Sequence, residues 1–164
     1  MKLAPIVFAA SLVLLANGFA DVTKLAAVDR SKIEGAVNPE LLRFTKDIPE
    51  TVRDACAAVI SDHVFRLAEP GQEFQVTDAI LKPNLPRRRL IWAARIPGYY
   101  VVHYEMGGRG HSYHVLLVEY DEIQKSARVV WSAAGTPGIP LKDYAQFVRA
   151  LKSGKLDDQR DYYH

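Results

Sequence analysis

The chain has 164 residues, of which 49% are hydrophobic, enough for one packed core of ordinary domain size. Its 21 basic and 19 acidic residues nearly cancel, giving a formal net charge of +2 with neutral histidines. A chain this close to neutral lacks the strong positive field that attracts nucleic acid, so we expect no nucleic-acid partner.

The first twenty residues have the pattern of a secretory signal peptide. Lys2 precedes an apolar run over residues 6–16, and Gly18 and Ala20 place small residues just before Asp21. This pattern predicts cleavage near Ala20 and a mature protein that is periplasmic or secreted. No later segment approaches the roughly 20 apolar residues that a spanning helix needs, so we expect no membrane span.

The only cysteine, Cys56, rules out an intramolecular disulfide in the exported chain. An exported domain without disulfides favours a bacterial periplasm or cell surface over a small animal-secreted domain. Cys56 lies among alanines in a predicted helix. We therefore interpret it as a small buried hydrophobic residue rather than as a catalytic thiol.

Residues 21–46 predict an N-terminal arm that contains one short helix. Asn38 is a capping residue and Pro39 suits the first helical position, so the short helix should run to Phe44. The stretch 21–36 has no clear periodicity, and it is either a loose arm or a weakly docked helix.

The single domain expected over residues 47–154 opens with a longer helix. Asp47 and Glu50 have the spacing of a capping box. Apolar residues then recur at helical spacing until Pro70 and Gly71, which should end the helix near Ala68. The apolar stripe of this helix includes Val52, Cys56, Val59 and His63.

The remaining sequence predicts a sheet followed by a second helix. Five strands joined by short turns should form an antiparallel meander, over residues 72–80, 88–95, 99–106, 111–120 and 128–133. Leu141 to Leu151 returns to helical spacing, and a polar tail covers residues 155–164. The predicted fold is therefore α+β: a two-layer sandwich with an N-terminal helix, a five-stranded antiparallel meander and a C-terminal helix.

A long hairpin over residues 99–120 dominates the predicted sheet, because two aromatic and β-branched runs flank Gly107-Gly108-Arg109-Gly110. A loop of two or four residues gives the same register, and the tip should lie in solvent. Tyrosine and arginine are favoured at protein interfaces. The predicted partner surface consists of Tyr104, Arg109, His111 and Tyr113.

The same register suggests a metal site as an alternative. It places His103 directly opposite His114, with Glu105 on the same face. Two imidazoles and a carboxylate suit zinc, and His63 could add a third imidazole if its helix covers that face. The simpler interpretation is a group of polar side chains beside a turn.

Two functions follow from these patterns. The favoured one is an exported non-catalytic binding module without a cofactor, such as an inhibitor, an immunity-type protein or an envelope accessory protein, which uses the hairpin to bind a protein partner. The alternative is a small metal-binding protein or metal-dependent enzyme using His103 and His114.

Two other chemistries find little support in the sequence. Ser112, His114 and Glu105 could be combined into a hydrolase triad, but the chain has no nucleophile elbow. The glycine-rich turn lacks the lysine of a phosphate-binding loop.

Overall fold

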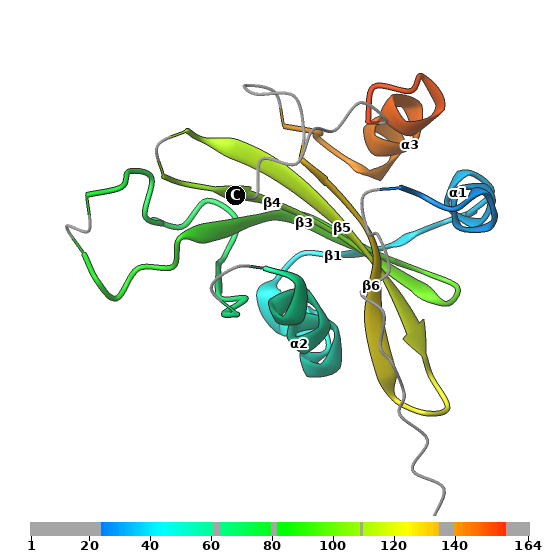
Figure 1. Ribbon diagram of the computed structural model, residues 1–164, viewed down its shortest axis with the longest axis horizontal. Helices are drawn as coiled ribbons and strands as arrows, with labels where there is room; N and C mark the ends of the chain where they lie inside the picture. The colour runs from blue at the N-terminus through cyan, green and yellow to red at the C-terminus, as the bar shows by residue number, and fades with distance from the viewer. Residues whose placement is uncertain (1–23, 61–62, 80–81, 109, 135–139, 157–164) are drawn as a thin grey trace, which may run out of the picture.

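The computed structural model describes residues 24–60, 63–79, 82–108, 110–134 and 140–156. The predicted signal peptide lies outside these residues, as does most of the predicted tail. The described helices are α1 (Ala27–Glu34), α2 (Glu50–Val59) and α3 (Tyr144–Lys152), with a 3-10 turn η1 at Thr45–Asp47. The strands are β1 (Glu40–Leu42), β2 (Leu67–Ala68), β3 (Arg88–Ile96), β4 (Tyr99–Met106), β5 (Ser112–Asp121) and β6 (Ser126–Ala134). The predicted α+β class is confirmed (Figure 1).

All of these strands belong to one sheet, with the order β1-β3-β4-β5-β6. The strands from β3 to β6 form the antiparallel meander that the sequence predicts. On the outer side of β3, β1 pairs antiparallel with Ala93–Arg95, and β2 pairs parallel with Arg88 and Arg89. The edge of the meander is therefore completed by two short strands from earlier in the chain.

The predicted strand at residues 72–80 is wrong, since residues 72–79 form turns and irregular structure. This segment crosses the end of the β4–β5 hairpin instead of running along β3. The Gln75 N–H donates to the Pro86 carbonyl at 2.8 Å, and the Gly108 N–H donates to the Val76 carbonyl at 3.1 Å. The alternating residues that predicted a strand thus belong to a loop that packs against the hairpin at Gly107 and Gly108.

Helices cover both faces of the sheet, so the expected two-layer arrangement is replaced by a helical layer on each side (Figure 1). On one face α2 contributes Val52 and Cys56 to a core that includes Tyr104 and Leu116. On the other face the core combines residues of α1, α3 and the sheet, among them Ile33, Phe147, Leu151, Trp92 and Trp131. Seven consecutive buried residues in β4 reflect this covering of both faces.

The N-terminal elements differ from prediction because pairing with β3 outweighs local helical signals. Residues 39–44 contain strand β1 instead of a short helix. Helix α2 ends at Val59, since Ile60 is extended and His63 has a positive φ of 50°. The apolar residues beyond Val59 enter the core from extended chain, where Phe65 is buried. The arm also contains a firmly docked helix, because Ile33 of α1 is fully buried.

Helix α3 is defined at both ends. At its N-terminus the Asp143 carboxylate accepts a hydrogen bond from the Gln146 N–H at 2.7 Å. At its C-terminus Gly154 has a positive φ of 70°, and the N–H groups of Gly154 and Lys155 return to the carbonyls of Leu151 and Ala150. This is a Schellman motif. It turns the chain back so that Leu156, within the predicted polar tail, is buried in the core.

Gly107 marks the closest approach between the hairpin and the covering loop. A Cβ atom at this position would lie 1.9 Å from the Gln75 carbonyl oxygen and 2.6 Å from the Val76 Cα. Both are main-chain atoms, so the loop would have to move. We expect Gly107→Ala to lower the free energy of unfolding by about 1–3 kcal/mol, measured by urea denaturation.

Gly110→Ala is the matched control, because a Cβ at Gly110 meets no atom within 4 Å. Its unfolding midpoint should stay close to that of the wild type. An equal loss of stability in both variants would contradict the close contact as the cause.

Candidate functional site

The register of the hairpin differs by one residue from the prediction. His103 pairs with Val115, and His114 pairs with Tyr104. The cause is the connection between Met106 and Ser112, which spans residues 107–111 and is longer by one residue than the expected four-residue loop. Because side chains alternate across a strand, this shift moves every β5 side chain to the opposite face.

The new register separates the predicted metal ligands. His103 and Glu105 share the face covered by α1 and α3, whereas His114 lies on the face covered by α2, where its ring stacks on Tyr104. His63 is exposed beyond the end of α2. Within the described ranges no three His, Cys, Asp or Glu side chains are grouped closely enough to hold a metal ion. The prediction that the two histidines face each other on one surface is wrong.

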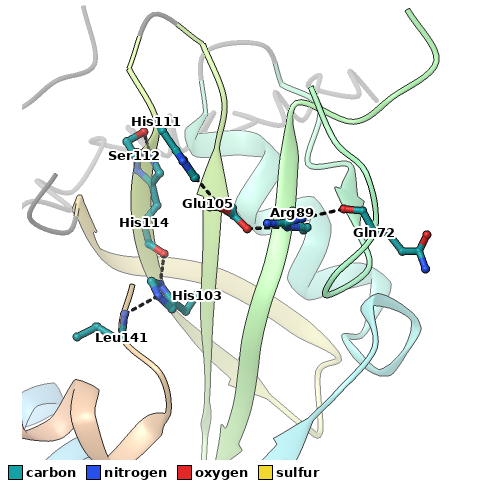
Figure 2. A network of polar contacts seen from close by, with 8 residues as sticks. All are labelled: Gln72, Arg89, His103, Glu105, His111, Ser112, His114 and Leu141. Carbon is teal, nitrogen blue, oxygen red and sulfur yellow. Dashed lines mark hydrogen bonds and ion pairs between the residues drawn. The ribbon is translucent and has the colours of Figure 1, made fainter. Parts of the chain in front are cut away.

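His103 instead links the sheet to the chain segment that enters α3. Its Nδ1 lies 2.8 Å from the His114 carbonyl oxygen, and its Nε2 accepts the Leu141 N–H at 3.2 Å (Figure 2). A carbonyl only accepts and an N–H only donates, so both contacts require the neutral imidazole with its proton on Nδ1. Burial lowers the pKa of His103, which favours the same neutral form.

Leu141 is held from a second side by Trp92. The Trp92 indole N–H donates to the Leu141 carbonyl at 2.8 Å, and the Trp92 ring lies 5.3 Å from the His103 ring. Trp92 and His103 are direct cross-strand neighbours on β3 and β4. The sheet therefore binds both polar main-chain groups of one residue at the start of the α3 segment.

A cavity of about 740 Å³ lies beside this contact, between the sheet and the last turn of α3. The sheet contributes His103 and Tyr113 to its lining. The α3 side contributes apolar residues and two cations, and it includes Leu141, Ala150, Leu156, Arg149 and Lys155. Cavities of this volume with an apolar lining and a few polar groups are typical of small-molecule sites.

A second polar group, on the same face as His103, closes the tip of the hairpin. The Glu105 carboxylate, only 6% exposed, is bound by Arg89 Nε at 2.6 Å and by His111 Nε2 at 2.5 Å (Figure 2). Arg89 also donates to the Gln72 carbonyl at 3.0 Å, and its guanidinium lies 4.5 Å from the centre of the Phe74 ring. Glu105 thus holds the covering loop through Arg89, while Gly110 and His111 in the hairpin connection are exposed.

Ser112 and His114 form a pair without the predicted acid. The Ser112 hydroxyl lies 2.7 Å from His114 Nε2, but Glu105 projects from the opposite face of the sheet. Burial lowers the pKa of His114 to about 4. An imidazole with so low a pKa is a weak acceptor for a serine proton. The geometry therefore does not assemble the hydrolase triad.

Cys56 is fully buried, and burial raises the pKa of its thiol. A buried thiol in apolar surroundings is inert, as a structural cysteine is expected to be.

The four residues of the predicted partner surface have different environments. Tyr104 is fully buried, and Arg109 lies outside the described residues. His111 is exposed and Tyr113 is partly exposed, and their rings lie 5.0 Å apart. The structure thus keeps two of the four at the surface and brings one of them, Tyr113, into the cavity.

The α3 side of the cavity was not predicted from the sequence. Arg149 and Lys155 follow the ordinary pattern of basic residues near the C-terminus of a helix, so their types gave no separate signal. Leu156 stands in a run of mostly polar residues, and only the Schellman turn at Gly154 brings it back to the sheet. The Ser153-Gly154 pair was the one available sign of such a turn.

Comparison of the chain with protein-family models, with curated proteins and with solved structures found no match. In the part of the chain that the structure describes, no helix is long and apolar enough to cross a membrane.

Proposed function

We propose that this protein is an exported, non-catalytic binding module whose ligand occupies the cavity between α3 and the hairpin. The observation that carries the proposal is the cavity itself, with a volume of about 740 Å³ and a lining that is apolar at Leu141, Ala150 and Leu156. Its walls are held by the hydrogen bonds of His103 and Trp92 to Leu141. A site formed in advance in this way loses little entropy on binding.

Binding is favoured over catalysis by the state of the titratable groups around the cavity. Both ring nitrogens of His103 are occupied by main-chain partners, so neither can exchange a proton with a ligand without breaking a buried hydrogen bond. The Ser112–His114 pair lies on the other face of the sheet, away from the cavity. Among the described lining residues, no carboxylate or thiol is present to serve as a general acid, base or nucleophile.

The signal-like residues 1–20 support a location in the periplasm or outside the cell. Within the exported binding proteins, an envelope accessory role is favoured over an inhibitor or immunity role. The loop over residues 72–79 ties down the β4 side of the tip, since the Gly108 N–H donates to the Val76 carbonyl, so that side is not free to insert into a target.

Filling the cavity tests this proposal. Ala150 lines the cavity, and Ala150→Trp should occupy much of its volume. We expect wild-type protein to bind N-phenylnaphthylamine, an uncharged fluorescent probe, at one saturable site, and the variant to bind it at least tenfold more weakly, the loss that about 1.4 kcal/mol of contact energy corresponds to.

Ala145→Trp is the matched control, because Ala145 is exposed on the same helix and does not line the cavity. It should bind the probe like the wild type, and thermal melting should show that both variants are folded. Unchanged probe binding in a folded Ala150→Trp variant would refute the cavity as the binding site.

A further inference from the structure

We infer that the ligand of this cavity is an amphiphilic carboxylate, with an anionic head bound near Arg149 and Lys155 and an apolar chain against the cavity wall. The inference rests on the proposed function, because it names the chemical class of the ligand for the same site. Three properties of the lining lead to it: its charge, its hydrogen-bonding capacity and its apolar surface.

The charge of the lining is positive. Arg149 and Lys155 are exposed cations that line the cavity. In the described structure neither side chain forms an ion pair, and no Asp or Glu lines the cavity beside them. The buried Glu105 carboxylate on this face of the hairpin is neutralised by Arg89. A ligand in this cavity therefore meets two positive charges that its own negative charge can balance.

The polar groups that remain available to a ligand are mainly donors. His103 uses both ring nitrogens within the protein, and the side-chain Oε1 of Gln146 accepts the Lys142 N–H at 2.5 Å. The Ser153 hydroxyl donates to the Ala150 carbonyl at 3.0 Å. What is left is the side-chain amide nitrogen of Gln146, the Tyr113 hydroxyl, the two cationic ends and, as an acceptor, the Ser153 hydroxyl oxygen. Donors and cations together require a head group that accepts hydrogen bonds.

The partial negative charge at the C-terminus of α3 disfavours a bound anion, but this effect is smaller than the attraction of Arg149 and Lys155. A helix C-terminus carries about half a negative charge, located on its last carbonyls. Three of the last four carbonyls accept hydrogen bonds here, since the N–H groups of Ser153, Gly154 and Lys155 donate to Arg149, Leu151 and Ala150. Arg30 also donates to the Leu151 carbonyl at 2.9 Å. Two full positive charges outweigh this partly neutralised terminus.

The apolar part of the lining distinguishes an amphiphile from a small inorganic anion. Pro140, Leu141, Ala150 and Leu156 supply apolar surface, and Leu156 is itself buried in the core on this face. Inorganic anions would gain nothing from this surface, while an alkyl chain gains about 0.8 kcal/mol for each CH₂ group that it buries. The site thus matches a carboxylate that carries a hydrocarbon chain.

Three ligands with the same chain and different heads test the inference: decanoate, decanol and decylammonium. Each is titrated into full mature protein below its aggregation concentration and followed by displacement of N-phenylnaphthylamine. We expect decanoate to bind about tenfold more tightly than decanol, as one charged hydrogen bond allows, and decylammonium to bind more weakly than decanol.

The double variant Arg149→Gln with Lys155→Gln should remove the preference for decanoate, so that the ratio of the decanoate and decanol affinities falls from about ten to about one. Lys152→Gln is the matched control, because Lys152 is an exposed cation of the same helix turn that does not line the cavity. It should retain the preference for decanoate.

The outcomes separate this inference from the proposal on which it rests. Equal affinities for decanoate and decanol, both lost in Ala150→Trp, would overturn the anionic head and leave the cavity as a binding site. Decanoate binding that persists in Ala150→Trp would overturn both. A preference for decylammonium, or a preference for decanoate that survives the double variant, would also refute the inference.

Discussion

Replacing Trp131 with alanine should lower the free energy of unfolding by about 3–5 kcal/mol, the usual cost of truncating a buried tryptophan. Trp131 is 2% exposed and lies on β6, in the core between the sheet and α3. Its ring centre is 6.3 Å from that of Phe147. The cavity left by truncation would lie between two rigid elements that cannot close it, and urea denaturation measures the loss.

Val59→Asp provides the contrast. The helical pattern places Val59 in the core stripe, but α2 ends at this residue and its side chain is 39% exposed. A carboxylate there stays in contact with water, so the unfolding midpoint should change little. A loss as large as that of Trp131→Ala would contradict this position for Val59, and an unchanged midpoint in Trp131→Ala would contradict the packing of the α3 face.

Acidification from pH 7 to pH 4 should lower the stability of the protein by about 3 kcal/mol through His114 alone. Burial, followed by the charge of Arg88 and the proximity of His103, lowers the pKa of His114 from 6.5 to about 4. The unfolded chain therefore takes up a proton before the folded protein does. The stabilisation is complete above pH 6.5, falls between pH 6.5 and about 4, and is fully lost below that range.

His114→Phe tests this assignment, because phenylalanine preserves the ring stacked on Tyr104 and does not titrate in this range. Unfolding midpoints in urea at pH 7, 6, 5 and 4 should fall less steeply for the variant. His103 remains in the variant, and its lowered pKa leaves a residual slope of the same sign. An identical slope in the two proteins would show that His114 is not the group responsible.

Local sequence patterns predicted the elements that form from neighbouring parts of the chain, namely the hairpin strands and the C-terminal helix. The hairpin strands were recognisable because Tyr99–Met106 and Ser112–Asp121 are rich in aromatic and β-branched residues. The C-terminal helix was recognisable from its spacing between Leu141 and Leu151. The register was not, because three glycines around Arg109 permit several loop lengths and nothing local selects among them.

Long-range pairing determined the rest. Glu40–Leu42 carries a helix start signal at Pro39, yet it pairs with β3 and becomes a strand. The apolar residues after Val59 continue a helical spacing, but Phe65 is buried from extended chain and Val64 is exposed, because β2 pairs with Arg88 and Arg89. These contacts join residues that are far apart in the sequence, so a local pattern contains no information about them.

The candidate site was predicted only in part for the same reason. His103 and Tyr113 were identified as functional candidates, and both line the cavity. The predicted pairing of His103 with His114 was wrong, since a shift of one residue in register exchanges the two faces of β5. The other wall depends on where the Schellman turn directs Leu156, which is a tertiary property.

The two bonds that hold Leu141 use its peptide groups and ignore its side chain. Another apolar residue can therefore replace leucine at this position and keep both bonds and the apolar cavity lining, whereas proline cannot, since it has no N–H to donate. Trp92 and His103, by contrast, supply specific nitrogen atoms from facing positions of adjacent strands. Divergent chains with the same architecture can therefore be recognised by two features. They should carry a tryptophan and a histidine at facing positions of adjacent strands, and a helix that starts shortly after the meander.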